Sequence, residues 1–142
     1  MFSKEEAKEI RQQFWIFFGK RHPRKWLLYN TKIKDFSLKF DFDNKRALVA
    51  IDSESNDEVF RGYYFDKLLS LRTLMKEEVS QDLVFEEHYV LDNQKVISRC
   101  YLILEDVSIH NKNTWPEVFE FFHTYMSKME AFFLEYADFI KS

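Results

Sequence analysis

Residues 35–52 form the sequence DFSLKFDFDNKRALVAID, and this stretch decides the fold class. In its first half, Phe and Leu at even positions alternate with polar residues at odd positions, which is typical of a half-buried β-strand. The triplet Asp43–Lys45 is a turn signal, and a more uniformly apolar run from Arg46 to Asp52 follows it. We therefore expect a β-hairpin here, with a shorter strand around Trp26–Tyr29 before it.

A second hairpin is expected from residues 83–91 and 95–105, because two strand-like runs flank the turn signal DNQ. If Asp92 and Asn93 form a two-residue primed turn, Glu86 faces Arg99 across the strands, whereas a four-residue loop would shift this register. In the two-residue register, one face carries Phe85, Tyr89, Leu91, Val96 and Cys100. The other face carries Glu86 and Arg99 among Val84, Ile97 and Tyr101.

Glu86 and Arg99 form the most specific polar pair in the sequence. One interpretation is a cross-strand ion pair, which contributes little to stability when it is exposed. The other is that Arg99 binds a phosphate or carboxylate, for which its planar guanidinium is suited.

Three helices share one start signal, a Ser or Thr followed three residues later by Glu, which is the pattern of a capping box. The first begins at Ser3 and has an apolar face of Ala7, Ile10, Phe14, Phe17 and Phe18. The second begins at Ser55 and is expected to run to about Val79, with an inner stripe of Phe60, Tyr64, Leu68, Leu71 and Met75. The last is capped by Thr114, has Pro116 in its first turn, and has apolar positions as far as Ile140.

The resulting order, α-β-β-α-β-β-α, predicts an α+β fold in which helices pack on an antiparallel sheet of two hairpins. The 142 residues match the usual size of one domain, and no linker, internal repeat or low-complexity run divides them. We therefore expect a single domain over residues 1–142. The sixteen Phe indicate either a Phe-rich core or a shared face.

Charge, cysteine content and hydropathy narrow the location and the partners. The net charge of −3 provides no general attraction for nucleic acid, so such binding would need a local basic patch. The single cysteine, Cys100, rules out an internal disulfide and fits a reducing compartment. The charged N-terminus has no apolar signal core, and no apolar run approaches the roughly 18 residues that span a bilayer. We expect a cytoplasmic protein with no membrane contact.

The one local basic patch is residues 20–26, KRHPRKW, which we call the basic segment. Pro23 places Lys20 and Arg21 at the end of the first helix, where the helix dipole favours cations without any ligand. Arg24 and Lys25 lie beyond the proline and are less well explained in this way. The segment is therefore either a solvated helix end or a nucleic-acid-binding patch. In the second case, its basic side chains would bind phosphates and the Trp26 indole would stack on an unpaired base. The residues of the nucleic-acid alternative are Arg21, Arg24, Lys25, Trp26 and Arg99.

No side-chain pattern identifies a catalytic or metal site. The triplet Asp43–Lys45 formally matches the D-x-K element of metal-dependent nucleases, but its lysine would lie in a turn and not on a strand. Asp52 and Glu54 have no lysine partner in the pattern and are interpreted as strand-end residues. The four histidines lack the spacing of a zinc site, and Cys100 is interpreted as a small buried hydrophobe. We expect no cofactor, and an unrecognised enzyme ranks behind a binding role.

The apolar surface of the helices exceeds what a simple core requires. The last helix is apolar over roughly 160°, wider than the ~100° stripe of a surface helix. Trp15, Ile16 and Phe65 also fall outside the expected inner faces. Either the helices pack side by side and cover one another, or these residues form a surface for self-association or for a partner.

Several short motifs extend over nearly the whole chain. They are QQFWIFF at 12–18, Trp26, the helix from Asn56 to Val79, LVFEE at 83–87, VISR at 96–99 and TWPEVFEFF at 114–122. Together they resemble a bacterial family catalogued as domain of unknown function 4268. Phe85 stands where that resemblance leads us to expect Trp, and no catalytic residues carry over. Members of the family occur alone or behind a domain similar to restriction-type nucleases, which implies an accessory role near DNA metabolism or defence.

These observations together predict a non-enzymatic interaction module. We expect it to act as a homodimer or as a subunit beside a nuclease or defence enzyme. The alternative is a nucleic-acid-binding accessory domain that uses the basic segment.

Overall fold

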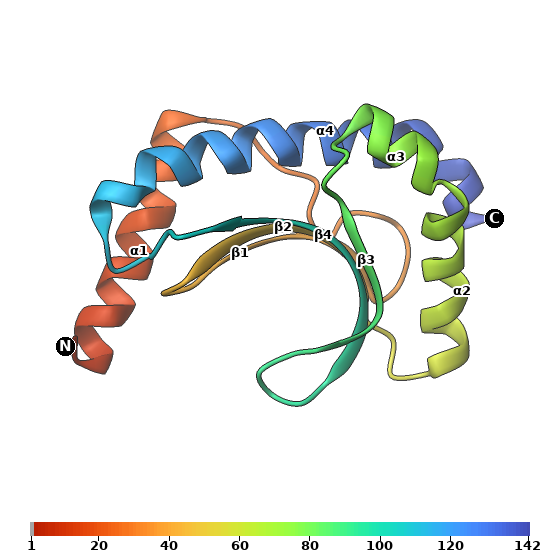
Figure 1. Cartoon of the computed structure of the whole chain (residues 1–142), viewed down its shortest axis with the longest axis horizontal. Helices are drawn as coiled ribbons and strands as arrows, with labels where there is room; N and C mark the ends of the chain where they lie inside the picture. The colour runs from red at the N-terminus through yellow and green to blue at the C-terminus, as the bar shows by residue number, and fades with distance from the viewer. Residues whose placement is uncertain (1) are drawn as a thin grey trace.

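A four-stranded antiparallel sheet forms the centre of the protein, whose computed structural model describes residues 2–142 (Figure 1). The strands are β1 (Phe36–Phe42), β2 (Arg46–Ser53), β3 (Val84–Val90) and β4 (Val96–Glu105), in the order β1-β2-β4-β3. The helices are α1 (Lys4–Arg21), α2 (Glu58–Ser70), α3 (Arg72–Glu78), the short η1 (Lys112–Thr114) and α4 (Trp115–Lys141). The α+β class, the two hairpins and the order of elements are confirmed.

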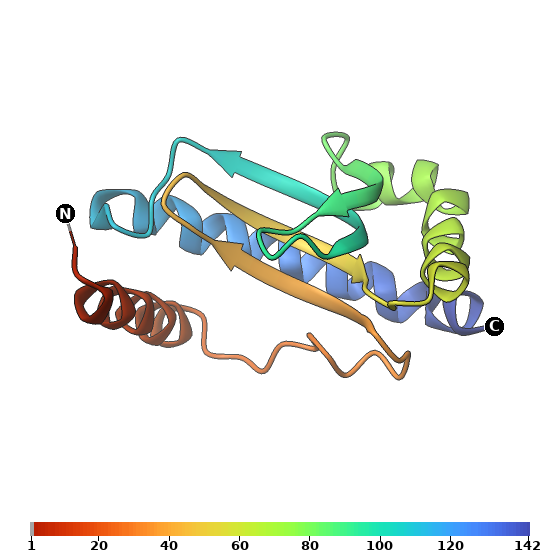
Figure 2. The same cartoon turned by 90° about the horizontal axis from the view of Figure 1, so that it is seen from below.

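The helix α4 crosses one face of the sheet, and the other face carries no helix. Figure 2 shows the sheet from the side without a helix, with α4 behind it, and we call this side the open face. Its central side chains, such as Leu48 and Asp52, are nevertheless buried. Side chains at even positions of β1 and β4 and at odd positions of β2 enter the core beneath α4. Examples are Leu38, Val49, Ile51, Cys100 and Leu102, which pack against Phe122, Met126 and Met129 of α4.

The first hairpin has the expected turn at Asp43–Lys45. The carboxylate of Asp43 accepts hydrogen bonds from the amides of Lys45 and Arg46 at 2.8 and 2.9 Å, which holds the turn closed. The expected strand at Trp26–Tyr29 is absent, so that prediction was wrong. Residues 23–30 instead form an irregular segment beside β1. The Leu27 amide donates to the Glu130 carboxylate and the Asn30 amide to the Leu27 carbonyl, so these amides do not form a strand ladder with β1.

The second hairpin contains two irregularities that compensate for each other. Its loop has three residues, whereas a two-residue turn was expected. Gln94, the last residue of the loop, is in the left-handed region at φ 71°. A bulge between Glu86 and Tyr89 then shifts the register back, so Glu86 does face Arg99 as predicted. The bulge also moves Tyr89 to the face of Arg99 and Tyr101, which corrects the predicted side for Tyr89.

The second helical region differs from the prediction in its start, its continuity and its buried face. Its cap is Asp57, whose carboxylate accepts from two amides, and not Ser55. The helix breaks at Leu71 into α2 and α3. Phe60 is exposed, whereas Phe65 is buried with Leu68 against the sheet. Leu68, Leu71 and Met75 of the predicted inner stripe are buried as expected, so the prediction was wrong only for the first turns, where Phe65 takes the place of Phe60 in the core.

The two remaining helices differ from expectation in detail. The capping box of Ser3 and Glu6 is confirmed. Phe17, expected on the inner face of α1, is exposed, whereas Phe14 and Phe18 are buried and Ile10 packs against the core. Thr114 precedes α4 as expected but does not cap it with its side chain. Its hydroxyl donates to the carbonyls of Ser108 and Asn111 and so fixes the preceding loop.

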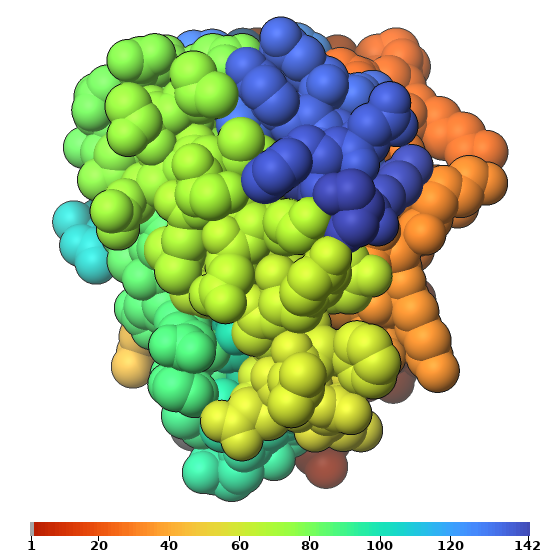
Figure 3. Space-filling view, turned by 90° about the vertical axis from the view of Figure 1, so that its right-hand side faces the viewer, coloured from red at the N-terminus to blue at the C-terminus, as the bar shows by residue number. Residues whose placement is uncertain are grey.

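The C-terminal end of α4 lies beside α2, as Figure 3 shows. The Lys67 ammonium donates to the carbonyls of Phe139 and Ser142 at 3.1 and 3.0 Å, so a cation satisfies carbonyls at the end of α4. Tyr63 also donates to the Ser142 carbonyl. These contacts fix the far end of the longest helix.

Candidate functional site

A cavity of about 370 Å³ opens between α1, the chain at 22–29 and strand β1. We call it the aromatic groove. Its lining is mostly apolar, with a few polar side chains, as is usual for binding pockets. The lining residues are Trp15, Phe18, Gly19, His22, Arg24, Trp26, Leu28, Tyr29, Leu38, Lys39 and Phe40.

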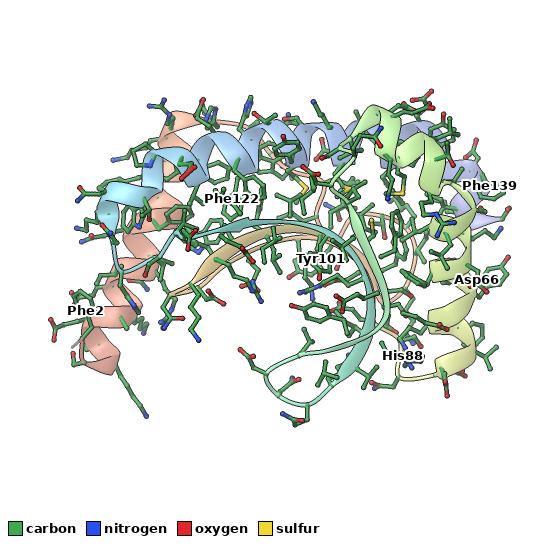
Figure 4. All side chains as sticks on the ribbon, viewed as in Figure 1. Phe2, Asp66, His88, Tyr101, Phe122 and Phe139 are labelled. Carbon is green, nitrogen blue, oxygen red and sulfur yellow. The ribbon has the colours of Figure 1, made fainter. Side chains whose placement is uncertain are left out.

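The walls of the aromatic groove are braced by aromatic packing. Trp15 stacks on Phe122 of α4, with ring centroids 5.7 Å apart and planes 5° apart. Phe40 contacts the same ring at 4.7 Å, and Figure 4 shows Phe122 between α4 and the sheet. Trp26 lies parallel to Phe18 at 6.3 Å. Since these rings belong to α1, α4, β1 and the chain between, the groove is a preformed feature of the fold.

The turn of α1 at residues 14–18 is apolar around its whole circumference. Phe14 and Phe18 are buried against the core, whereas Trp15, Ile16 and Phe17 remain 38%, 54% and 44% exposed. A helical turn that is apolar on every side is normally buried on every side. Trp15 and Ile16, which the sequence places outside the inner face of α1, are thus exposed, and Trp15 also lines the aromatic groove. Phe65, the third predicted interface residue, is buried in the core, so that prediction was wrong.

The basic segment is fastened to α4 by ion pairs. Arg21 and His22 both contact the carboxylate of Glu120, at 3.2 and 2.9 Å. Arg24 binds Glu130 at 2.6 Å, and the other oxygen of Glu130 accepts from the Leu27 amide at 2.7 Å. Two arginines of the basic segment thus have internal carboxylate partners.

The remaining residues predicted to bind nucleic acid, Lys25, Trp26 and Arg99, lie in different environments. The guanidinium of Arg24 covers one face of Trp26, 4.0 Å from the ring centroid. Lys25 is exposed, and among residues 2–142 it has no ion-pair partner. Arg99 lies on the open face of the sheet, whereas the basic segment contacts α4. The structure therefore does not bring Arg99 together with the other four residues.

Two histidines stack beside the aromatic groove. The rings of His22 and His123 are 4.0 Å apart and nearly parallel. Burial and the neighbouring His22 and Arg24 lower the pKa of His123, because a second cation here would be unfavourable. The hydrogen bonds from His22 and Arg21 lower the pKa of Glu120, which favours its charged form. The histidine pair thus joins the end of α1 to α4.

A row of polar side chains crosses the open face through facing positions on all four strands. It consists of Ser37, Asp52, Arg99 and Glu86. Arg99 holds Asp52 through two hydrogen bonds of 2.7 and 2.8 Å, and both side chains are buried. Arg99 therefore pairs with Asp52, and the expected ion pair with Glu86 was wrong. Glu86 instead accepts from the Tyr101 hydroxyl at 2.6 Å, and Figure 4 shows Tyr101 beneath the sheet, away from α4.

A lysine completes this network and corrects another prediction. Lys39 lies 3.6 Å from Asp52 and forms an ion pair with Glu54, so both acids have the lysine partner that the sequence pattern did not reveal. Burial raises the pKa of Asp52, and the charges of Arg99 and Lys39 oppose that shift. Burial acts to lower the pKa of Arg99, but its bonds to Asp52 outweigh burial and raise it. The network is thus a set of ion pairs that links the side chains of β1, β2 and β4 across the open face.

Two further groups show no reactive character. Burial raises the pKa of the Cys100 thiol, which is what the interpretation as a small buried hydrophobe requires. Burial and the bond to Glu86 raise the pKa of the Tyr101 hydroxyl. Among residues 2–142, no group of three or more His, Cys, Asp or Glu side chains is arranged to hold a metal ion.

Sequence reasoning missed the Asp52–Arg99 pair for an identifiable reason. Asp52 and Arg99 lie on different hairpins, and they meet because β2 lies beside β4. Strand periodicity tells which residues of one strand share a face with Asp52 or with Arg99. It does not show which strands are neighbours.

Comparison with known proteins leaves one relationship. No match was found among curated proteins or among solved structures. No helix in residues 2–142 has the length and apolar character needed to cross a bilayer. A family model described as Domain of unknown function (DUF4268) matches residues 10–137, which include the aromatic turn of α1, both hairpins and nearly all of α4. The chain therefore belongs to this family.

Proposed function

We propose that this chain is a non-enzymatic cytoplasmic module that works through protein contacts, as a homodimer or as a subunit beside a nuclease or defence enzyme. The exposed apolar turn at residues 14–18 supports this proposal most directly. Trp15, Ile16 and Phe17 expose apolar surface on one turn of α1, and Trp15 also forms a wall of the aromatic groove. Several large apolar side chains exposed on one helical turn favour a protein contact there.

The polar side chains of the molecule favour binding over catalysis. The buried charges of the open face are paired with one another, and the thiol of Cys100 is buried and protonated. A catalytic constellation would instead need a nucleophile or general base that a substrate can reach. The surface at α1 requires only a complementary apolar partner.

The test is the mass of the pure protein in solution, measured by sedimentation velocity over a range of concentrations. Ile16→Asp places a charge on the proposed surface, and Leu134→Asp is the matched control because it lies on α4 with nearly the same exposure, 56% against 54%. We expect self-association that Ile16→Asp abolishes and Leu134→Asp leaves intact. A wild-type protein that stays monomeric at every concentration would contradict the homodimer. Equal effects of the two substitutions would contradict this choice of surface.

A nucleic-acid role remains the second candidate. The side chains of Arg21 and Arg24 are 55% and 37% exposed despite their ion pairs. Lys25, which lies between Arg24 and Trp26 in the sequence, is also exposed. Titration with labelled duplex and single-stranded DNA and RNA at about 50 and 200 mM salt distinguishes the candidates. Binding that falls with salt and with Arg24→Ala/Lys25→Ala would favour this role. We expect no such binding, because the two arginines are bound to Glu120 and Glu130.

A further inference from the structure

Strand β1 has a partly unpaired edge. In the first hairpin, the Asp43 amide donates to the Arg46 carbonyl at 3.0 Å, and the Glu54 amide donates to the Asp35 carbonyl at 2.7 Å. Hydrogen-bonded pairs alternate along an antiparallel ladder, so residues 37, 39 and 41 of β1 bond to β2. The N–H and C=O groups of residues 36, 38, 40 and 42 therefore point away from the sheet.

Part of this outer edge is already covered by the chain at 28–31. The Leu38 amide donates to the Leu28 carbonyl at 3.0 Å, and the Thr31 hydroxyl donates to the Phe36 carbonyl at 2.7 Å. Beyond that point the cover ends. Within residues 2–142, no protein group bonds to the N–H or C=O of Phe40. The uncovered edge faces the aromatic groove, because Phe40, Leu38 and Lys39 line it.

We propose that the aromatic groove binds an extended peptide segment of a partner protein, which adds a short strand to β1 at Phe40. This inference rests on the proposed function as a protein-interaction module and names the chemistry of its partner. The unpaired backbone groups of Phe40 require hydrogen-bond partners, and an extended peptide supplies both a donor and an acceptor at the correct spacing. An apolar helix or a small apolar ligand would leave these groups unsatisfied.

The geometry also determines which side chain of the peptide is recognised. The residue paired with Phe40 directs its side chain to the same side as Phe40, toward Trp15, Phe18 and Trp26. Its two neighbours point to the side of Lys39, on the open face. The expected ligand is therefore an extended segment with one aromatic or large aliphatic residue between two polar residues.

The opposite edge of the sheet is a poorer site for such a partner. β3 carries the bulge between Glu86 and Tyr89, which interrupts the regular spacing of its backbone groups. Its charged Glu86 and Glu87 further discourage strand addition. The uncovered part of β1 has no bulge, and the charges beside Phe40 are neutralised, because Lys39 pairs with Glu54 and Asp41 with Arg46. This edge is also backed by the cavity of about 370 Å³.

Gly19 provides a sharp test because it lines the aromatic groove and a Cβ there would meet nothing within 4 Å. Gly19→Trp should fill the groove from the exposed side of α1, and Gly19→Ala is the matched control that leaves it open. The probe is a displayed library of short random peptides, selected on the wild-type protein. Circular dichroism of both variants checks that α1 remains folded.

We expect selection to enrich peptides with one large apolar residue between polar residues, and Gly19→Trp, but not Gly19→Ala, to abolish their binding. N-methylation of the peptide residue opposite Phe40 should weaken binding about tenfold, because it removes a backbone donor. Amide resonances of residues 38–42 should shift on binding. Failure to enrich any peptide, or enriched peptides that bind Gly19→Trp and wild type equally, would overturn the strand-addition proposal. Self-association that depends on Ile16, without peptide binding, would leave the proposed function standing and reject this inference alone.

Discussion

The buried Asp52–Arg99 pair allows a quantitative prediction about stability. Asp52→Asn leaves the guanidinium of Arg99, 4% exposed, without its carboxylate partner. Removing one partner of a buried pair destabilises a protein by about 3–5 kcal/mol, because the remaining charge stays desolvated. We expect Asp52→Asn at the upper end of that range. Arg99→Met should fall near about 3 kcal/mol, because Lys39 still lies 3.6 Å from Asp52.

The assay is urea unfolding followed by far-ultraviolet circular dichroism, with Lys39→Met as the control. Lys39 is 25% exposed, and its ion pairs with Asp52 and Glu54 are therefore more solvated than the pair of Asp52 with Arg99, so its removal should destabilise the fold by about 1 kcal/mol or less. The double variant Asp52→Asn/Arg99→Met should be less destabilised than the sum of these two single changes by about 2 kcal/mol, since it leaves neither member of the pair as an unpaired buried charge. Single changes of Asp52 and Arg99 that each lower stability by less than about 1 kcal/mol would refute this reasoning.

The same pair predicts a pH dependence. In Arg99→Met, the pKa of Asp52 should rise further, since burial already raises it and the opposing cation is gone. A carboxyl with a raised folded-state pKa binds protons more readily when folded, so lowering the pH stabilises the folded state relative to the unfolded one. The penalty of Arg99→Met relative to wild type should therefore be largest near neutral pH and shrink as the pH falls toward about 4. A penalty that grows on acidification would contradict the assignment.

Three further predictions concern positions that the structure distinguishes clearly. Phe65→Ala should destabilise the fold by about 3–5 kcal/mol, whereas Phe60→Ala on the exposed side of α2 should change stability by about 0.5 kcal/mol or less; urea unfolding checks both. Gly62→Ala should raise the unfolding free energy by about 1 kcal/mol, because an added Cβ meets nothing within 4 Å. The Cys100 thiol is buried and has a raised pKa, so it should react with a disulfide reagent only as fast as the protein unfolds locally or globally to expose it, which the rate of labelling measures.

The candidate site was predictable only in part. Trp15 and Ile16 could be identified from the sequence, because they lie off the apolar face of α1 defined by Phe14 and Phe18. The aromatic groove could not, because its walls come from α1, the chain at 22–29 and β1. No local pattern predicts that Phe40 and Trp26 meet at 5.4 Å. The same limit hid the partners of the basic segment, since Glu120 and Glu130 lie about a hundred residues away on α4.

The sequence by itself determined the hairpins, the helices and their order, because alternation, turn residues and caps act between residues close along the chain. Only the tertiary structure decided that Phe65 of α2 is buried in place of Phe60, where Tyr89 points after the bulge, and that Arg99 pairs with Asp52. These outcomes depend on which strands become neighbours and on how side chains share a limited core volume. They arise from contacts between residues that are far apart in the sequence. The free energy of these contacts is larger than that of the local conformational preferences.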